Sequence, residues 1–166
     1  MKRLLYRRRW LIRVIALVGA LVAAYLGARH AWRTAHEDDV YAAALRHWCE
    51  HSLPSASRGQ ALYVQLDGKD PDEQLIGRLR ESVPGARKYS ERPIPPDAGV
   101  RVGLCDLTWV GWTAARVSVV DTCTWTRVGG QHYRVVRRGG RWDVASVAAF
   151  GYEVYRAPPR PDRRPP

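Results

Sequence analysis

The stretch Tyr133-Arg-Val-Val-Arg-Arg-Gly-Gly-Arg-Trp-Asp-Val144 has the pattern of a β-hairpin. Runs of β-branched and aromatic residues flank Gly139-Gly140, and a glycine pair supplies the positive φ angles that a tight hairpin turn requires. We therefore expect strands over residues 131–138 and 141–150. A lone hairpin is only marginally stable in water, so the neighbouring sequence must supply partners for its apolar face.

Two more strands are expected immediately before this hairpin. Residues 101–109 and 113–127 read as strands joined by a turn at Val110-Gly-Trp112. Gly129-Gly130 has the composition of a second turn and is expected to lead into the strand over 131–138. The C-terminal half of the chain is therefore predicted to be a meander of four antiparallel strands.

The residues before this meander predict two helices and a short strand. Thr34 and Glu37 have the spacing of a capping box, which predicts a helix from residue 35 to 51. Residues 61–66 alternate as a strand. Asp70-Pro-Asp-Glu73 predicts a second helix start, with Asp70 as the cap and Pro at the first helical position, and Pro84-Gly85 ends that helix. A loop is expected from there to about residue 99. The pattern predicts an α+β domain with two helices on a curved antiparallel sheet.

The N-terminus has the pattern of a membrane anchor. Six Lys or Arg residues in 1–13 precede an apolar run over 11–28 that only Arg13 interrupts. Eighteen helical residues span roughly 27 Å, close to the thickness of a bilayer core. The positive-inside rule places 1–13 in the cytoplasm and the domain over 34–152 outside it, as in a single-pass protein of a bacterial cytoplasmic (inner) membrane. The alternative is a cleaved signal peptide, with Val22-Ala-Ala24 as the cleavage site.

The net charge of +11 does not indicate a nucleic-acid-binding domain, because the excess lies at the two ends. Residues 1–13 carry +6, and the segment 156–166 has four Arg and one Asp. Residues 14–155 are left with 17 basic and 15 acidic groups, a difference of only +2. The Pro/Arg-rich tail over 153–166 is expected to be disordered, since Pro cannot continue a helix or a central strand.

The domain resembles the cystatin-like, or NTF2-like, superfamily. The resemblance rests on an Ala- and aromatic-rich helix, Tyr41-Ala-Ala-Ala-Leu-Arg-His-Trp48, followed at the end of the chain by the Tyr strand and Gly-Arg-Trp-x-Val strand of 133–144. It implies a cone, in which a curved sheet wraps around a helix. The superfamily contains enzymes such as ketosteroid isomerase and scytalone dehydratase. It also contains non-enzymatic periplasmic domains of secretion components that follow one membrane helix, so the fold alone does not choose a function.

One sequence motif suggests a metal. His47-Trp-Cys-Glu50-His51 matches the inverted zinc-protease pattern H-x-x-E-H. The motif lies in the last turn of the predicted helix, where His is favourable for another reason, its interaction with the helix dipole. The chain is also far smaller than such peptidases. We therefore expect no metal and no cofactor.

Three cysteines lie in a segment expected to be in an oxidising compartment. In the predicted register, Cys105 and Cys123 are roughly 20 Å apart along the strands, which is too far for a disulfide. A bridge would therefore join Cys49 to Cys105 or to Cys123. The alternative is three buried thiols that act as small apolar side chains.

Asp121 is the acid expected on the concave face of the sheet. In the predicted register, Arg101 and Arg138 lie opposite Asp121 on the two neighbouring strands. An acid between two guanidinium groups has a lowered pKa and is a poor base. A cross-strand Arg–Asp–Arg cluster is therefore preferred over a catalytic acid.

The sequence predicts a binding function more readily than an enzyme. The chain has seven Trp, eight Tyr and one Phe, and Trp109, Trp112 and Trp125 are the expected contacts for a partner. The leading hypothesis is a non-catalytic, membrane-anchored module that binds an envelope protein, a small apolar ligand or a second copy of itself. The alternative is an isomerase or dehydratase with Asp121 as the base and Tyr133 as the hydrogen-bond donor.

Overall fold

A computed structural model describes residues 2–53, 59–91, 99–124 and 127–152, and the remaining residues, among them Trp125 and the tail over 153–166, lie outside this description. Side chains are described for residues 10–53, 59–91, 99–120 and 130–150. The chain forms two compact units, Met1–Glu37 and Asp38–Pro166, which we call unit 1 and unit 2.

A single helix, α1 (Lys2–His51), supplies all the described residues of unit 1 and the first residues of unit 2. By length and composition it is apolar enough to cross a membrane. Its large apolar side chains are exposed at ten positions: Trp10, Leu11, Ile12, Ile15, Leu17, Val18, Leu21, Val22, Tyr25 and Leu26. The prediction of one apolar helix long enough to span a bilayer is thus confirmed.

The predicted helix start at Thr34 is wrong, because α1 runs through this position without a break. The Thr34 hydroxyl donates to the carbonyl oxygen of His30, four residues earlier, at 3.2 Å. A threonine inside a helix commonly makes this bond. Thr34 therefore caps no helix, and its spacing to Glu37 is coincidental.

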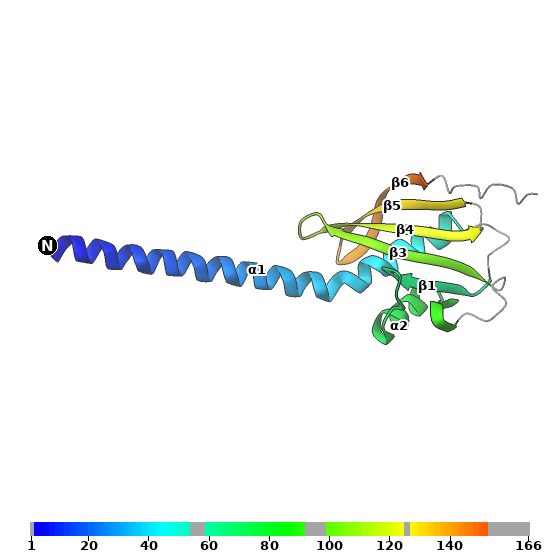
Figure 1. The fold of residues 1–166 in the computed structure, drawn as a ribbon, viewed down its shortest axis with the longest axis horizontal. Coiled ribbons are helices and arrows are strands. Elements are labelled where there is room, and N and C mark those ends of the chain that lie inside the picture. Colours follow the sequence, from blue (N-terminus) through cyan, green and yellow to red (C-terminus); the bar gives the residue numbers. More distant parts are fainter. Residues whose placement is uncertain (1, 54–58, 92–98, 125–126, 153–166) are drawn as a thin grey trace, which may run out of the picture. The chain divides into compact units, whose positions relative to one another are not determined.

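Unit 2 contains a six-stranded sheet in the order β2-β1-β3-β4-β5-β6 (Figure 1). Its strands are β1 (Leu62–Leu66), β2 (Ala86–Lys88), β3 (Val100–Trp109), β4 (Ala114–Thr124), β5 (Arg127–Arg138) and β6 (Arg141–Tyr152). Strands β3 to β6 form the predicted antiparallel meander. The α+β class is confirmed.

The prediction of a wholly antiparallel sheet is wrong, because β1 pairs in parallel with both of its neighbours, β2 and β3. The chain leaves β1, forms α2 (Glu73–Ser82) and returns as β2, which is a β-α-β connection and makes the two strands parallel. The stretch expected to be a loop also holds a short 3₁₀ helix, Tyr89–Glu91. The sheet is therefore mixed.

The sequence correctly predicted that α2 begins just after Asp70-Pro71, but the residue that caps the helix is Asp72 and not the expected Asp70. The Asp72 carboxylate accepts from the backbone N–H of Leu75 at 2.8 Å. Asp70 accepts instead from the backbone N–H of Ser90 at 3.1 Å. The helix ends before Pro84 as predicted, with Val83 at its C-cap.

The two glycine pairs of the meander have different roles. Gly139 and Gly140 have φ angles of 56° and 83° and form the β5–β6 turn, as predicted. Gly130 lies inside β5, opposite Val120 and Phe150, so the predicted turn at Gly129-Gly130 is wrong. A Cβ atom on Gly130 would come within 2.2 Å of the Phe150 ring, which explains why a glycine is needed there.

The core of unit 2 lies between the sheet and the helices. Its largest fully buried side chains are Trp48 and Tyr41 of α1 and Tyr133 of β5. Around them pack buried aliphatic residues of α2, β3 and β4: Ile76, Leu79, Val102, Leu104, Val117 and Val119. This packing fixes the last turns of α1 beside β5 and β6.

Candidate functional site

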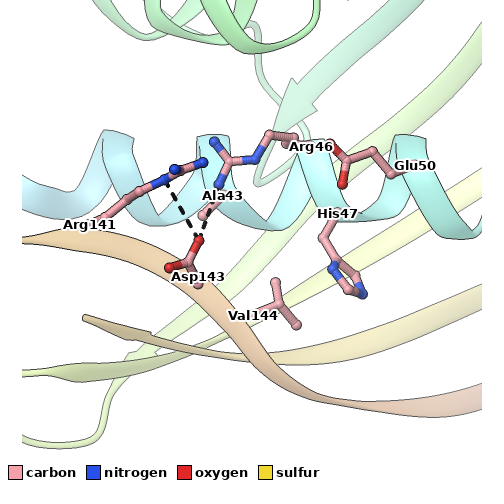
Figure 2. Close-up of a pocket in the computed structure, with 7 residues that line it drawn as sticks. All are labelled: Ala43, Arg46, His47, Glu50, Arg141, Asp143 and Val144. Carbon is pink, nitrogen blue, oxygen red and sulfur yellow. Dashed lines mark ion pairs between the residues drawn. The ribbon is translucent and has the colours of Figure 1, made fainter. Parts of the chain in front are cut away.

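A polar cleft lies where the last turns of α1 meet the beginning of β6 (Figure 2). Its volume is about 260 Å³, and four of its residues come from α1 and three from β6: Ala43, Arg46, His47, Glu50, Arg141, Asp143 and Val144. The α1 residues are spaced at i, i+3, i+4 and i+7, so they form one stripe along the helix. Three of the helix residues between them, Ala44, Leu45 and Trp48, are buried and face the core.

The charges in the cleft centre on Asp143. Its carboxylate oxygen Oδ1 lies 3.6 Å from an Arg46 guanidinium nitrogen and 3.9 Å from Nε of Arg141. Figure 2 shows both guanidinium groups directed at this carboxylate. Arg46 also donates to the backbone carbonyl of Trp142 at 3.4 Å. With Glu50 included, two positive and two negative side chains line the cleft, so its charge is balanced.

His47 is the titratable ring of the cleft. Its ring packs edge-on against Tyr133, with centroids 5.7 Å apart, and stacks on His51 at 4.1 Å. Burial, and secondarily the neighbouring His51, lowers the pKa of His47, with Glu50 opposing this change. His47 is therefore held as the neutral imidazole at neutral pH.

A half-buried polar network lies beyond His47. The hydroxyl of Ser52 donates to Oε1 of Gln131 at 2.9 Å, and the hydroxyl of Tyr133 donates to the same oxygen. Tyr133 is fully buried. The network ties the end of α1 to β5, and it occupies the Tyr133 hydroxyl that an isomerase would direct at its substrate.

The H-x-x-E-H residues do not converge on a metal. Nδ1 of His51 lies 3.0 Å from the backbone carbonyl of His47, and since a carbonyl can only accept, this nitrogen carries the proton. The two rings stack instead of opening toward a common point. Among the residues that the structure describes, no group of three His, Cys, Asp or Glu side chains could hold a metal ion.

The predicted Arg101–Asp121–Arg138 cluster is wrong, because both hairpin registers differ from those expected. Asp121 pairs with Val102 on β3 and with Gly129 on β5. Gly129 is nine residues from Arg138 along the strand, which is roughly 30 Å. Arg101 instead places its guanidinium carbon 4.5 Å from the centre of the Tyr89 ring, and Arg138 lies opposite Arg141 at the β5–β6 turn.

The tryptophans expected to contact a partner have different environments. Trp109 packs edge-on against Trp142 at 5.7 Å, and Trp142 is buried, so Trp109 contributes to the packing beside the cleft. Trp112 is half-buried in the β3–β4 turn, next to the exposed Val110. Trp125 lies outside the described residues.

The described cysteines are poor nucleophiles. Cys49 and Cys105 are free thiols, so the structure contains no bridge between them, and the side chain of Cys123 lies outside the description. Burial raises the pKa of the Cys49 thiol to about 11, and burial together with Asp106 raises that of Cys105 to about 11. Both thiols remain protonated at neutral pH.

A serine–histidine contact on β4 and β5 was not foreseen from the sequence. The Ser118 hydroxyl and Nδ1 of His132 are 2.8 Å apart, and the His132 ring stacks on Phe150 at 4.2 Å. The contact has the geometry of a nucleophile and its base. Ser118, however, is only 1% exposed, so this pair stabilises the sheet and is not open to a substrate.

Sequence reasoning missed the Arg46–Asp143–Arg141 grouping. Arg141 and Asp143 are two residues apart on a strand, and their relation to Arg46 depends on where α1 crosses β6, which no local pattern specifies.

Comparison with known proteins adds nothing to this picture, since no family model, curated protein or solved structure matches the chain.

Proposed function

We propose that this chain is a single-pass membrane protein whose unit 2 is a non-catalytic binding module. Its N-terminus would lie in the cytoplasm and unit 2 outside it, at the cytoplasmic membrane of a bacterium. The apolar, exposed part of α1 supports the membrane attachment, and the excess of Lys and Arg in residues 1–13 supports the orientation. A cystatin-like architecture for unit 2 remains part of the proposal.

The observation that carries the binding role is the internal pairing of the cleft's charges. Asp143 is held between Arg46 and Arg141, and burial keeps His47 neutral, so these groups are not arranged as an activated nucleophile with its base. A cleft of about 260 Å³ with balanced charge suits a polar segment of a protein partner. Charged groups of the partner could pair with Asp143, Arg46 or Arg141 in place of the contacts these residues make with one another.

A small apolar ligand has less support than a protein partner. The space between sheet and helices is filled by Trp48, Tyr41 and Tyr133, and the cleft beside it is lined by charged residues. The isomerase alternative also has less support, because the hydroxyl of Tyr133 is engaged by Gln131.

Site-specific photocrosslinking in intact cells tests the binding role. A photoreactive residue at Arg141, on the rim of the cleft, should give a discrete adduct with one partner protein. The same residue at Arg87, which is exposed on β2 at the other edge of the sheet, is the matched control and should give none. Adding Asp143→Ala should reduce the Arg141 adduct at least severalfold while the circular dichroism spectrum is kept. Equal adducts at both positions, or none at Arg141, would contradict the proposal.

A reporter fusion tests the orientation separately. An enzyme that is active only outside the cytoplasm, fused after Pro166, should be active in whole cells. Activity restricted to a cytoplasmic reporter at the same position would overturn the placement of unit 2 and leave the cleft result standing on its own.

A further inference from the structure

The two outermost strands of the described sheet are protected from further pairing to very different degrees. At one edge, β2 has only three residues, Ala86–Lys88, and two of them are charged. At the other edge, β6 has twelve residues. An edge strand presents unpaired N–H and C=O groups, and proteins usually block such edges with short strands, charges or proline. β2 follows this rule.

β6 lacks charge and proline over most of its length. After Asp143, residues 144–152 (Val-Ala-Ser-Val-Ala-Ala-Phe-Gly-Tyr) contain neither a charged residue nor a proline. Five consecutive residues, 145–149, are exposed, and Val147 is 42% exposed. Four of these five side chains are Ala or Ser, so they shield the backbone poorly and allow another strand to approach closely.

One protective feature is present, at the beginning of this stretch. Arg134 pairs with Ser146 and Val135 with Val144, so Ala145 is an extra residue that forms a bulge. Pairing with β5 is regular again from Ser146 to Tyr152. A bulge twists the strand locally and hinders pairing only around its own position. Seven residues of regular edge remain beyond it.

We propose that a second copy of this chain pairs with β6 through residues 146–152, antiparallel and about a two-fold axis. In such a pairing each strand meets the same stretch in reverse, so an edge without charge opposes no like charges. Pairing through β2 would instead bring Arg87 and Lys88 close to their own copies. The two sheets would join into one continuous sheet, with β6 at its centre.

The rest of the chain favours a second copy as the occupant. Residues 14–155 hold 17 basic and 15 acidic groups, so electrostatic repulsion between two copies of this part of the chain is weak, and the uncharged stretch of β6 adds none at the contact. The proposal also rests on the proposed membrane attachment, which raises the effective concentration of copies and compensates for an interface made by a single strand. This proposal does not depend on the cleft or on its partner.

The first test is the mass of the full chain in detergent, measured by light scattering after gel filtration. The wild type should be a dimer. Val147→Lys should weaken dimerisation roughly tenfold, because it places like charges at the edge. Val110→Lys is the matched control: Val110 is 50% exposed in the β3–β4 turn, and this change should leave the dimer intact. A monomeric wild type, or an equal effect of both changes, would overturn the proposal.

Disulfide trapping locates the axis and excludes dimerisation through α1. Single changes to Cys at Ser146, Val147, Ala148 and Ala149 place a thiol at successive positions along the edge. Directly opposed residues have Cα atoms about 4.5–5.5 Å apart, within disulfide range, and the distance grows quickly on both sides of the axis. Oxidation in membranes should give one maximum along this series, above the wild-type background from the native cysteines. Uniform or background crosslinking at all four positions would show that β6 is not the contact.

Discussion

The two ends of α1 use apolar residues in opposite ways. Between Trp10 and Leu26, large apolar side chains project around the helix and are exposed. Between Val40 and Trp48, the apolar side chains form one stripe, and Val40, Ala44, Leu45 and Trp48 are each at most 1% exposed. A helix that is apolar on all sides needs a surrounding apolar medium, whereas a helix with one apolar stripe needs only one protein surface. The two regions of this continuous helix therefore require different surroundings.

Unit 2 has a core of its own, which does not use the region of α1 that is apolar enough to cross a membrane. The apolar stripe at the end of α1 buries Trp48 and Tyr41 against the sheet. This packing involves no residue of unit 1, so changes in unit 1 should not disturb it. The charged pairs that follow the apolar region begin with Asp38 and Asp39, both of which contact Arg78 of α2. A substitution in one region of α1 should accordingly leave the other region unaffected.

The largest effect is expected from charges in the first region. The double change Leu17→Arg and Leu21→Arg should release the chain from membranes, because each Leu-to-Arg change at the centre of a span costs about 3 kcal/mol or more. Both side chains are more than 60% exposed, so no protein contact is lost. The measurement is sedimentation with the membrane fraction after an alkaline wash. The pair Leu17→Ala and Leu21→Ala should stay in the pellet; release of this control, or retention of the arginine variant, would mean that the helix does not hold the chain in the bilayer.

The next effect lies in the second region. Trp48→Ala should lower the free energy of unfolding of unit 2 by about 3–5 kcal/mol, since it removes a large, fully buried ring. Urea unfolding of the full chain in detergent, followed by near-ultraviolet circular dichroism, measures it. Trp10→Ala removes the same side chain from an exposed position of the first region and should leave the unfolding midpoint unchanged. Equal shifts from both changes would mean that the two regions are not independent.

The contrast also shows which parts of the fold a sequence can reveal. The apolar run over 11–28 and the buried stripe through Trp48 were both predictable, because each depends only on residues close together in the chain. The helix boundary at Thr34 was not, since a capping box raises the stability of a helix start by about 1 kcal/mol and cannot prevent a longer helix. A capping pattern gives only a small free-energy preference for starting a helix at one residue. The hydrogen bonds of a longer, unbroken helix can outweigh that preference.

The sheet shows the same limit. Gly139-Gly140 lies at a turn as predicted, but Gly130 serves the packing of Phe150, twenty residues later in the sequence. A turn at Gly129-Gly130 would place Arg138 opposite Asp121, whereas Asp121 lies opposite Gly129. The expected pairing of Asp121 with Arg101 fails separately, because the β3–β4 register differs by one residue. An Arg–Asp–Arg grouping does occur, around Asp143, but one of its members comes from α1. The sequence therefore predicted that an Asp would pair with two Arg side chains, but it did not predict which residues would form the group.

A smaller effect concerns the pH response of the second region. Because the pKa of His47 is lowered in the fold, the unfolded chain takes up a proton before the folded chain does. Stability should fall as the pH drops below 6.5 toward the lower pKa of the folded state. The titratable and charged groups near this ring are Arg46, Glu50 and His51 on α1 and, across the cleft, Arg141 and Asp143 on β6.

His47→Gln should reduce this loss of stability between pH 7.5 and pH 5.5, since glutamine does not titrate. Urea midpoints at the two pH values measure it. His30→Gln, a change in unit 1, should keep the wild-type pH dependence. A His47→Gln variant as acid-sensitive as the wild type would mean that burial of this ring does not govern the response.

The smallest effect tests whether α1 is continuous at Thr34, between its exposed apolar region and its buried stripe. In a continuous helix, Thr34→Ala should stabilise this part of α1 by a few tenths of a kcal/mol, because Ala has the higher helix propensity. At a true cap the same change would cost about 1 kcal/mol, so the two cases differ in sign. Hydrogen exchange at the backbone amides of His36 and Glu37 measures it. In an unbroken helix these amides donate to the carbonyls of Trp32 and Arg33, and the alanine variant should protect them at least as well as the wild type. Faster exchange at both amides would restore the cap and divide α1 into two helices.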